Sequence, residues 1–170
     1  MEIQAPFGFV TGCHPGDKFM VQATLASMRH YCPDVPICLV VDGEVDVDDL
    51  QVQYDLIVLR VMDLPSDEMR NLISGNYRAK LAAMWEGPFE FYVWMDSDAI
   101  VWGNFTSQVR MDVDFQIFWS EISIESDASD VPSWLPHYYF DPEILKKFDP
   151  EFDWRGHPYF SAGVYACRRM

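Results

Sequence analysis

An apolar stretch of the sequence leads directly into two aspartates. Phe89 to Met95 is apolar at every position except Glu90, and it lacks the alternation that is typical of a half-exposed strand. The pattern predicts a central parallel strand that is covered on both faces. Asp96 and Asp98 follow at the carboxyl end of this strand. Because ligands of open α/β sheets bind beyond the carboxyl ends of the strands, we expect the functional site here.

Strand and helix patterns alternate before this stretch, and one more strand pattern comes near the end of the chain. Apolar residues recur at the spacing of one helical face between Asp17, a plausible helix cap, and Pro33, which ends the segment. That helical face consists of Met20, Val21, Thr24, Leu25 and Met28, and further strands are predicted at Phe7–Thr11, Pro36–Val41, Tyr54–Val61 and Tyr159–Cys167. The order of these elements predicts an α/β fold.

A second helix is predicted just before the aspartate strand. Its apolar residues lie at i, i+4, i+7 and i+8, and Gly87 stands where this helix would end. The residues of this apolar arc are Tyr77, Leu81, Met84 and Trp85. Lys80 lies on the flank of the arc, so its side chain either reaches over the sheet edge or remains in solvent.

Length, composition and charge narrow the range of functions. They predict one compact domain over residues 1–170, since 49% of the residues are hydrophobic and 15% are aromatic. The formal net charge of −15 disfavours nucleic acid and anionic lipid as partners. A phosphate-bearing ligand therefore has to be received locally, by helix N-termini, a few basic side chains or a bound divalent cation.

The sequence carries no pattern typical of secretion, of a membrane span or of a zinc site. The N-terminus has no basic segment followed by an apolar core, and no apolar run approaches the ~20 residues that cross a bilayer. The cysteines form no CxxC pair, and we expect small buried side chains at Cys13, Cys32, Cys38 and Cys167. We therefore expect a protein of the reducing cytoplasm.

Residues 120–158 differ from the rest in composition. They contain five prolines and many acidic residues, which predicts an elaborated loop region. Their aromatic rings either stack on the faces of sugars or cover the core. These aromatic residues include Trp134, Tyr138, Tyr139 and Trp154.

Two carboxylates that are separated by one residue at a strand end can both turn toward one hard cation. Mg²⁺ or Mn²⁺ accepts such an oxygen environment and leaves room for the oxygens of a diphosphate. Asp96 and Asp98 are therefore candidate metal ligands. The alternative is that one or both aspartates cap the turn that follows the strand, as Asp commonly does.

Four segments, residues 9–28, 78–81, 92–98 and 159–164, taken together and in this order resemble the nucleotide-sugar-binding half of GT-A-type glycosyltransferases, most closely the retaining family 8 group. Residues 9–12, 19 and 25–28 resemble the first strand, the nucleotide-contacting loop and the helix with a serine. Residues 78–81 resemble the helix whose basic residues approach the sugar nucleotide. Residues 92–98 resemble the metal-binding DxD motif with its strand, and residues 159–164 resemble a downstream strand of the family.

This resemblance implies a GT-A (nucleotide-diphospho-sugar transferase) fold, a Rossmann-like mixed sheet flanked by helices. It implies a metal-dependent, hexosyltransferase-like enzyme that binds a nucleotide sugar, of which a UDP-sugar is expected, and transfers the sugar to an unknown glycan, protein or small-molecule acceptor. Asp96 and Asp98 would hold Mn²⁺ or Mg²⁺. The implied nucleotide- or sugar-binding residues are Thr11, Gly12, Phe19, Arg78, Lys80, Ser97, Ser161, Ala162 and Gly163.

The chain departs from the family's pattern in two places. Ser161 replaces the usual Asn beside the sugar site. The family also supplies a third metal ligand, a histidine, from a segment well beyond Gly163, whereas this chain stops at Met170. His137 and His157 both precede Gly163, so neither matches that ligand. We therefore expect a C-terminally truncated GT-A domain.

Two other functions fit part of the pattern. Residues 96–100 also match the phosphatase motif of haloacid-dehalogenase-type enzymes, with Asp96 as nucleophile and Asp98 as acid/base. That motif normally follows the first strand of its domain, whereas three strand candidates come earlier here. The second alternative is a non-catalytic domain that binds a nucleotide sugar or a carbohydrate, and a measurement of donor hydrolysis beside donor binding separates it from the enzyme.

Overall fold

A computed structural model describes residues 2–75, 78–118, 120–122, 147, 150–151, 159–160 and 163–170. The chain divides into two compact units, Met1–Phe118 with Gly163–Met170 and Trp119–Ala162. In its described part, the second unit contains β6 (Ser120–Ile122) and β7 (Tyr159–Phe160), which pair antiparallel. The candidate functional site described below lies in the first unit.

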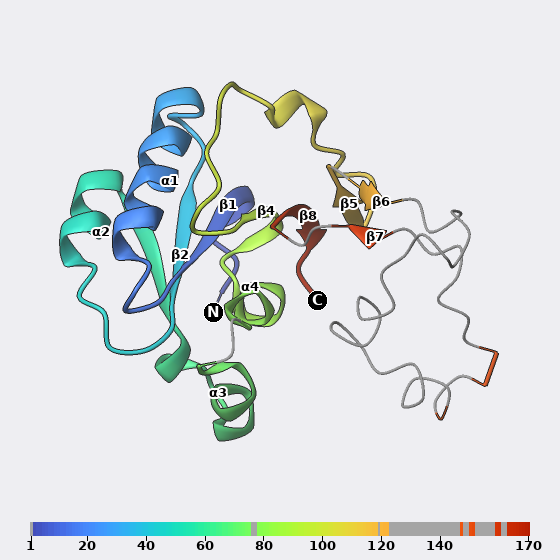
Figure 1. The fold of residues 1–170 in the computed structure, drawn as a ribbon, viewed down its shortest axis with the longest axis horizontal. Coiled ribbons are helices and arrows are strands. Elements are labelled where there is room, and N and C mark those ends of the chain that lie inside the picture. Colours follow the sequence, from blue (N-terminus) through green and yellow to red (C-terminus); the bar gives the residue numbers. More distant parts are fainter. Residues whose placement is uncertain are drawn as a thin grey trace. The chain divides into compact units, whose positions relative to one another are not determined.

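The first unit alternates strands and helices up to β4 (Figure 1). Its elements are β1 (Ala5–Cys13), α1 (Lys18–Tyr31), β2 (Ile37–Val41), α2 (Asp48–Tyr54), β3 (Leu56–Arg60), the short helical turn η1 (Val61–Asp63), α3 (Asp67–Ile73), α4 (Ala79–Glu86), β4 (Phe89–Met95), the turn η2 (Thr106–Gln108), β5 (Phe115–Ile117) and β8 (Val164–Arg168). None of the helices in the described residues is long and apolar enough to cross a membrane.

The described strands of this unit form one six-stranded mixed sheet in the order β3-β2-β1-β4-β8-β5. β1 pairs parallel with both β2 and β4, and β8 runs antiparallel between β4 and β5. The chain moves outward from β1 to β3 and then returns to β4 on the other side of β1. The carboxyl edge between β1 and β4 is therefore a topological switch point, where ligands of such sheets bind.

Helices cover both faces of the sheet (Figure 1). α1 and α2 pack on one face, with Leu25 and Leu50 in the core cluster on that side. α3 and α4 pack on the other face, with Ile73 and Ala83 in the second cluster. β4 is buried at every position except Glu90, so the prediction of a central strand covered on both faces is confirmed, but β4 is parallel only to β1 and runs antiparallel to β8.

The sequence predicted the first three strands and the first helix correctly, apart from the region around the start of the third strand. α1 follows Asp17 and ends before Pro33, as predicted. The acidic connection before the third strand, however, forms helix α2, which buries Leu50 and Tyr54. The predicted strand start at Tyr54 is therefore wrong, and β3 begins at Leu56 after Asp55 reverses the chain in a left-handed conformation.

The predicted apolar arc of the second helix is confirmed only in part: Leu81 and Met84 pack against the second core cluster, but they are not the most deeply buried residues of the helix. α4 turns its alanines inward, because small side chains let the helix lie close to the bulky aromatic residues of β4, and Ala79, Ala82 and Ala83 are buried. Leu81, Met84 and Trp85 are only half-buried, and Tyr77 lies outside the described residues. Gly87 does end the helix, as predicted: a Cβ there would lie 2.4 Å from the Ala83 carbonyl oxygen.

The predicted strand from Tyr159 to Cys167 is interrupted. β7 pairs with β6 in a separate sheet, and β8 begins only at Val164, where it pairs with β4 and β5. Gly163 lies in a turn immediately before β8, and residues 161 and 162 lie outside the described residues.

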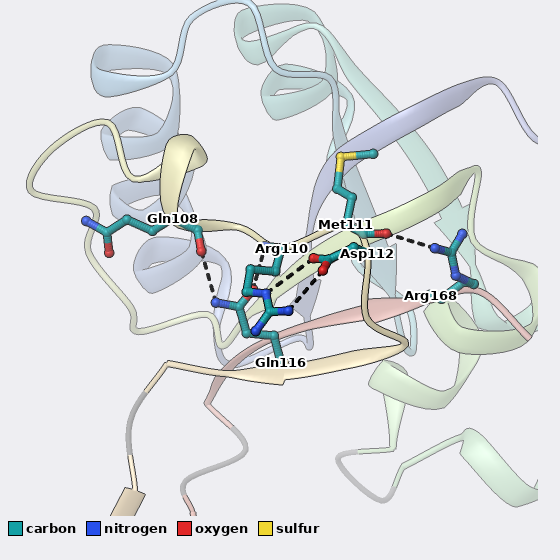
Figure 2. Close-up of polar contacts among 6 residues, drawn as sticks. All are labelled: Gln108, Arg110, Met111, Asp112, Gln116 and Arg168. Carbon is teal, nitrogen blue, oxygen red and sulfur yellow. Dashed lines mark hydrogen bonds and ion pairs between the residues drawn. The ribbon is translucent and has the colours of Figure 1, made fainter.

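The connection from β4 to β5 has little regular structure, and side chains satisfy part of its backbone (Figure 2). Gln116 accepts a hydrogen bond from the Arg110 amide at 2.7 Å and donates one to the Gln108 carbonyl at 3.0 Å. The guanidinium of Arg168 donates to the Met111 carbonyl at 2.9 Å. These bonds tie the connection to β5 and β8.

Candidate functional site

A pocket of about 370 Å³ lies at the carboxyl edge of the sheet, between the ends of β1 and β4. Four segments line it: the end of β1 with the loop that follows, the start of α1, the start of α4, and the end of β4 with its turn. The lining residues are Gly12, His14, Asp17, Met20, Ala79, Lys80, Trp94, Asp96, Ser97 and Asp98. The pocket occupies the switch point at which the sequence predicts a ligand site.

The turn that carries both aspartates is held from two sides. The Asp96 amide donates to the Gly163 carbonyl at 2.7 Å, which joins the turn to the start of β8. On the other side, the Thr24 hydroxyl of α1 donates to the Ser97 carbonyl at 2.6 Å. The Ala99 amide closes the turn onto the Asp96 carbonyl at 3.0 Å. The backbone around Asp96 is therefore fixed before any ligand arrives.

Lys80 points into this pocket from the first turn of α4. Its ammonium lies 3.6 Å from Oδ1 of Asp96 and 5.7 Å from the centre of the Trp94 ring. The same Asp96 oxygen accepts a hydrogen bond from Trp94 Nε1 at 2.7 Å. Only 28% of the Lys80 side chain is exposed, so it lies over the sheet edge rather than in open solvent.

The loop after β1 contributes a histidine to the pocket, and a buried carboxylate lies behind it. His14 follows β1, and its Nδ1 lies 3.7 Å from Oδ2 of Asp42, which follows β2. Asp42 is only 2% exposed, and the same oxygen accepts a hydrogen bond from the Gly75 amide at 2.8 Å. A carboxylate behind a histidine restricts the orientation of the imidazole ring.

The chemistry of the donor set fits a partly protein-bound hard cation. Asp96 and Asp98 line one pocket, and Asp98 has no hydrogen bond or ion pair within the part of the chain that the structure describes. No group of three or more His, Cys, Asp or Glu side chains among the described residues is placed to hold a metal ion. The two carboxylates would therefore supply only part of a six-coordinate shell, and ligand oxygens and water would complete it.

The structure brings some of the predicted residues together and separates others. Gly12, Lys80, Asp96, Ser97 and Asp98 line one pocket, and the Gly163 carbonyl adjoins Asp96. Three others lie outside the lining: Thr11 is fully buried, Phe19 is 72% exposed, and Arg78 donates to the Leu72 carbonyl at 3.0 Å. Ser161, Ala162, His137 and His157 lie outside the described residues, as do the aromatics Trp134, Tyr138, Tyr139 and Trp154.

Sequence reasoning missed several residues of the pocket. His14 and Asp17 follow the carboxyl end of β1, so the argument that selected Asp96 at the end of β4 applies equally to them. Trp94 lies two residues before Asp96, and residues at that spacing share a face of a strand. Asp42, a buried carboxylate, likewise follows the carboxyl end of a predicted strand, in this case β2.

The cysteines take no part in the pocket lining. All four are buried and unpaired, which confirms the prediction of small buried side chains. Burial raises the pKa of the Cys13 thiol to about 11, with a further contribution from the negative charge of Asp17. Burial raises the pKa of Cys38 to about 12. Thiols with such pKa values are neutral at physiological pH and therefore poor nucleophiles or metal ligands.

No protein-family model and no curated protein matches this chain. Solved structures do match it in fold. The galactosyltransferase LgtC, in complex with donor and acceptor sugar analogs, matches with a TM-score of 0.57 at 14% identity, covering 99% of this chain and 58% of LgtC. The bifunctional glycosyltransferase WbbM matches with a TM-score of 0.56 at 14% identity, covering 99% of this chain and 32% of WbbM.

A third match is glucosyl-3-phosphoglycerate synthase from Mycobacterium tuberculosis, in complex with Mn²⁺, UDP-glucose and phosphoglyceric acid. Its TM-score is 0.53 at 13% identity, and the match covers 96% of this chain and 56% of the synthase. The chain therefore spans about a third to somewhat more than half of the length of these enzymes. Identities this low establish the fold alone. The chain has the GT-A fold of these glycosyltransferases, as the sequence predicted.

Proposed function

We propose that this chain binds a uridine diphosphate sugar together with Mn²⁺ or Mg²⁺ at the carboxyl edge of β1 and β4, and acts as a glycosyltransferase domain. The observation that carries the proposal is the pocket that gathers Asp96, Asp98 and Lys80 at the switch point of a GT-A sheet. Donor complexes of LgtC and of the mycobacterial synthase, enzymes with this fold, support the choice of ligand.

The charges of the pocket suit a diphosphate only when a cation is present. The net charge of −15 repels a nucleoside diphosphate, and Asp17 adds a negative charge to the lining. Asp96 and Asp98 would hold the cation between the protein and the phosphates. α4 has no acidic residue in its first turn, so its N-terminus and Lys80 present positive charge to the same space.

Different side chains of the pocket would contribute to binding of the donor and to transfer of its sugar. Asp96 and Asp98 would hold the cation, which when bound would supply Lewis acidity toward the negative charge of the diphosphate. Lys80 places a donor beside the phosphate oxygens, and the bonded turn at Asp96 keeps these groups in position. Gly12 lets the end of β1 lie close to the Trp94 ring in the pocket wall, because a Cβ there would lie only 3.2 Å from that ring. Thr11, Phe19, Arg78, Ser161, Ala162 and Gly163 remain predicted contacts of the nucleotide or sugar.

Titration calorimetry tests the binding part of the proposal. UDP should bind in the presence of Mn²⁺ or Mg²⁺ and should not bind measurably in EDTA. Asp96→Asn and Asp98→Asn should each abolish metal-dependent binding while the thermal unfolding transition is retained. The control is Asp34→Asn, which makes the same charge change in an exposed residue before β2, at the opposite edge of the sheet. Undiminished binding by either site variant would remove that residue from the metal site.

Release of UDP from donor sugars tests the catalytic part. We would measure it with Mn²⁺, with several UDP-sugars, and with and without candidate acceptors. Release that is faster than in the Asp98→Asn variant indicates an enzyme, because binding alone consumes no donor. Binding without any release indicates the non-catalytic donor-binding domain instead.

A further inference from the structure

We propose that Asp42 is a positioning residue of the pocket. Its buried carboxylate joins the loop after β1 to the segment before α4, and so holds the wall that carries His14 and the wall that carries Lys80 at a fixed spacing. Its effect on nucleotide binding rests on the function proposed above. Asp42 is absent from the pocket lining, so it acts through the residues that it holds.

The first wall is attached to Asp42 and its neighbour at several points. The Asp42 amide donates to the Cys13 carbonyl at 3.0 Å, and Asp42 Oδ2 lies 3.7 Å from Nδ1 of His14. Next to Asp42, Gly43 adopts a φ of +90°, and a Cβ on it would lie 3.3 Å from the Pro15 ring. The loop that carries His14 therefore rests directly against the end of β2.

The second wall is attached through one strong contact. Asp42 Oδ2 accepts a hydrogen bond from the Gly75 amide at 2.8 Å, across 33 residues of sequence. Gly75 has a φ of +72°, a left-handed conformation that favours glycine. Four residues later α4 begins with Ala79 and Lys80, both of which line the pocket. Fixing Gly75 therefore restricts where this helix can start.

The burial of Asp42 argues for a role in positioning. Taking a carboxylate out of water costs several kcal/mol, and an apolar side chain would fill the same place without that cost. A charged, hydrogen-bonded group instead specifies one arrangement of its partners, because any other arrangement leaves the charge unsatisfied. One oxygen atom of Asp42, Oδ2, lies close to both His14 and Gly75. A single group therefore fixes the position of one wall relative to the other.

The experiment compares Asp42→Ala, Asp42→Asn and a control in the strand that precedes Asp42. Asparagine keeps an acceptor for the Gly75 amide and loses the charge that faces His14, whereas alanine loses both. Cys38→Ala removes a fully buried side chain of β2 away from the pocket, so it should lower the melting temperature and leave binding unchanged. For each protein we would measure amide hydrogen exchange at Gly75 and Lys80 without ligand, and the affinity for UDP with Mn²⁺.

The proposal predicts a graded result. In Asp42→Ala, exchange at Gly75 should become at least about 10-fold faster, and UDP affinity should fall about 10- to 100-fold, the range for losing a hydrogen bond to a charged group. Asp42→Asn should keep Gly75 protected and lose only about 3- to 10-fold in affinity. This partial rescue distinguishes positioning from a general loss of stability, which Cys38→Ala reports.

Three results would count against the proposal. Unchanged exchange at Gly75 in Asp42→Ala would mean that Asp42 does not hold the second wall. Wild-type affinity in that variant would mean that the contact serves stability alone, and if Asp42→Ala does not fold, wild-type affinity in Asp42→Asn leads to the same conclusion. A wild-type protein that does not bind UDP would overturn the proposed function, and the exchange data would then decide whether Asp42 joins the walls.

Discussion

The ammonium of Lys80 lies 3.6 Å from Oδ1 of Asp96, and the two residues come from the first turn of α4 and the end of β4. The same oxygen accepts the Trp94 indole hydrogen bond, so the protein itself partly balances the charge of Asp96. Asp98 is exposed and has no such partner within the described chain. The two aspartates therefore differ in environment: Asp96 is held in place, and Asp98 is available to a ligand.

Replacing Lys80 tests whether its position matters for the ligand. Lys80→Ala should weaken binding of UDP with Mn²⁺ by about 1.5–3 kcal/mol, the range for a hydrogen bond to a charged group, and should barely change the melting temperature. The measurement is titration calorimetry. Lys18→Ala is the control, since Lys18 pairs with Asp49 at 2.7 Å and lies outside the pocket lining. Equal dissociation constants for Lys80→Ala and wild type would show that Lys80 has no part in binding.

A substitution at Gly8 tests the packing between β1 and β4 that supports the site. A Cβ at Gly8 would lie 2.3 Å from the fully buried Phe89 ring, so Gly8→Ala should lower the free energy of unfolding by about 1–3 kcal/mol through overpacking. A smaller side chain in Phe89→Leu leaves room for the new methyl group. Urea unfolding of both single variants and the double variant should therefore give a favourable coupling of about 1 kcal/mol. Strictly additive losses would contradict the predicted clash.

Arg29 joins three segments at the opposite edge of the sheet. Its guanidinium donates to the backbone carbonyls of Tyr54, Pro33, Val35 and Asp55 at 2.6–3.1 Å. Arg29→Met should cost about 2–3 kcal/mol of unfolding free energy, because partly buried carbonyls lose their donors. Arg110→Met removes an exposed arginine paired with Asp112 and should change stability by less than about 0.5 kcal/mol. Chemical denaturation of the two variants provides the comparison, and similar losses in both would contradict the role given to Arg29.

Because its thiols are buried, the protein should lose free energy of unfolding at alkaline pH. Burial raises the pKa of Cys38 to about 12, above the value of about 8.5 in an unfolded chain. Folding thus favours the neutral thiol, and its contribution is complete below about pH 8.5 and is lost as the pH rises toward 12. Between these values the loss is about 1.4 kcal/mol per pH unit for this group. Urea midpoints at pH 8 and pH 10.5 should fall less in Cys38→Ala than in wild type, and equal falls would contradict the assignment.

Local patterns in the sequence predicted the elements with the clearest periodicity. The apolar run from Phe89 to Met95 is a strand with the predicted bounds, and Gly87 ends the helix before it. The helix between Asp17 and Pro33 followed from spacing alone. These features depend on neighbours in the chain, so a short window of sequence contains the information that decides them.

The sequence of α4 alone does not predict which of its residues are buried against the sheet. Leu81 and Met84 of the predicted arc pack against the core only partly buried, whereas Ala82 and Ala83 are fully buried in it. The competing requirement was close packing against the large aromatic residues of β4, which lie beyond the helix in sequence. Helix α2 was missed for a related reason, since its buried residues are only Leu50 and Tyr54 and its remaining positions read as an acidic loop.

The sequence by itself determined that Asp96 and Asp98 follow a buried strand, because an apolar run of that length is covered on both faces wherever it lies. Only the tertiary structure decided which other side chains lie beside these aspartates. Lys80 reaches Asp96, and Asp42 reaches His14 and Gly75, because the sheet order places β1 between β2 and β4 and brings the ends of three strands to one edge. Contacts across 16 to 33 residues depend on that order of strands, which no local pattern specifies.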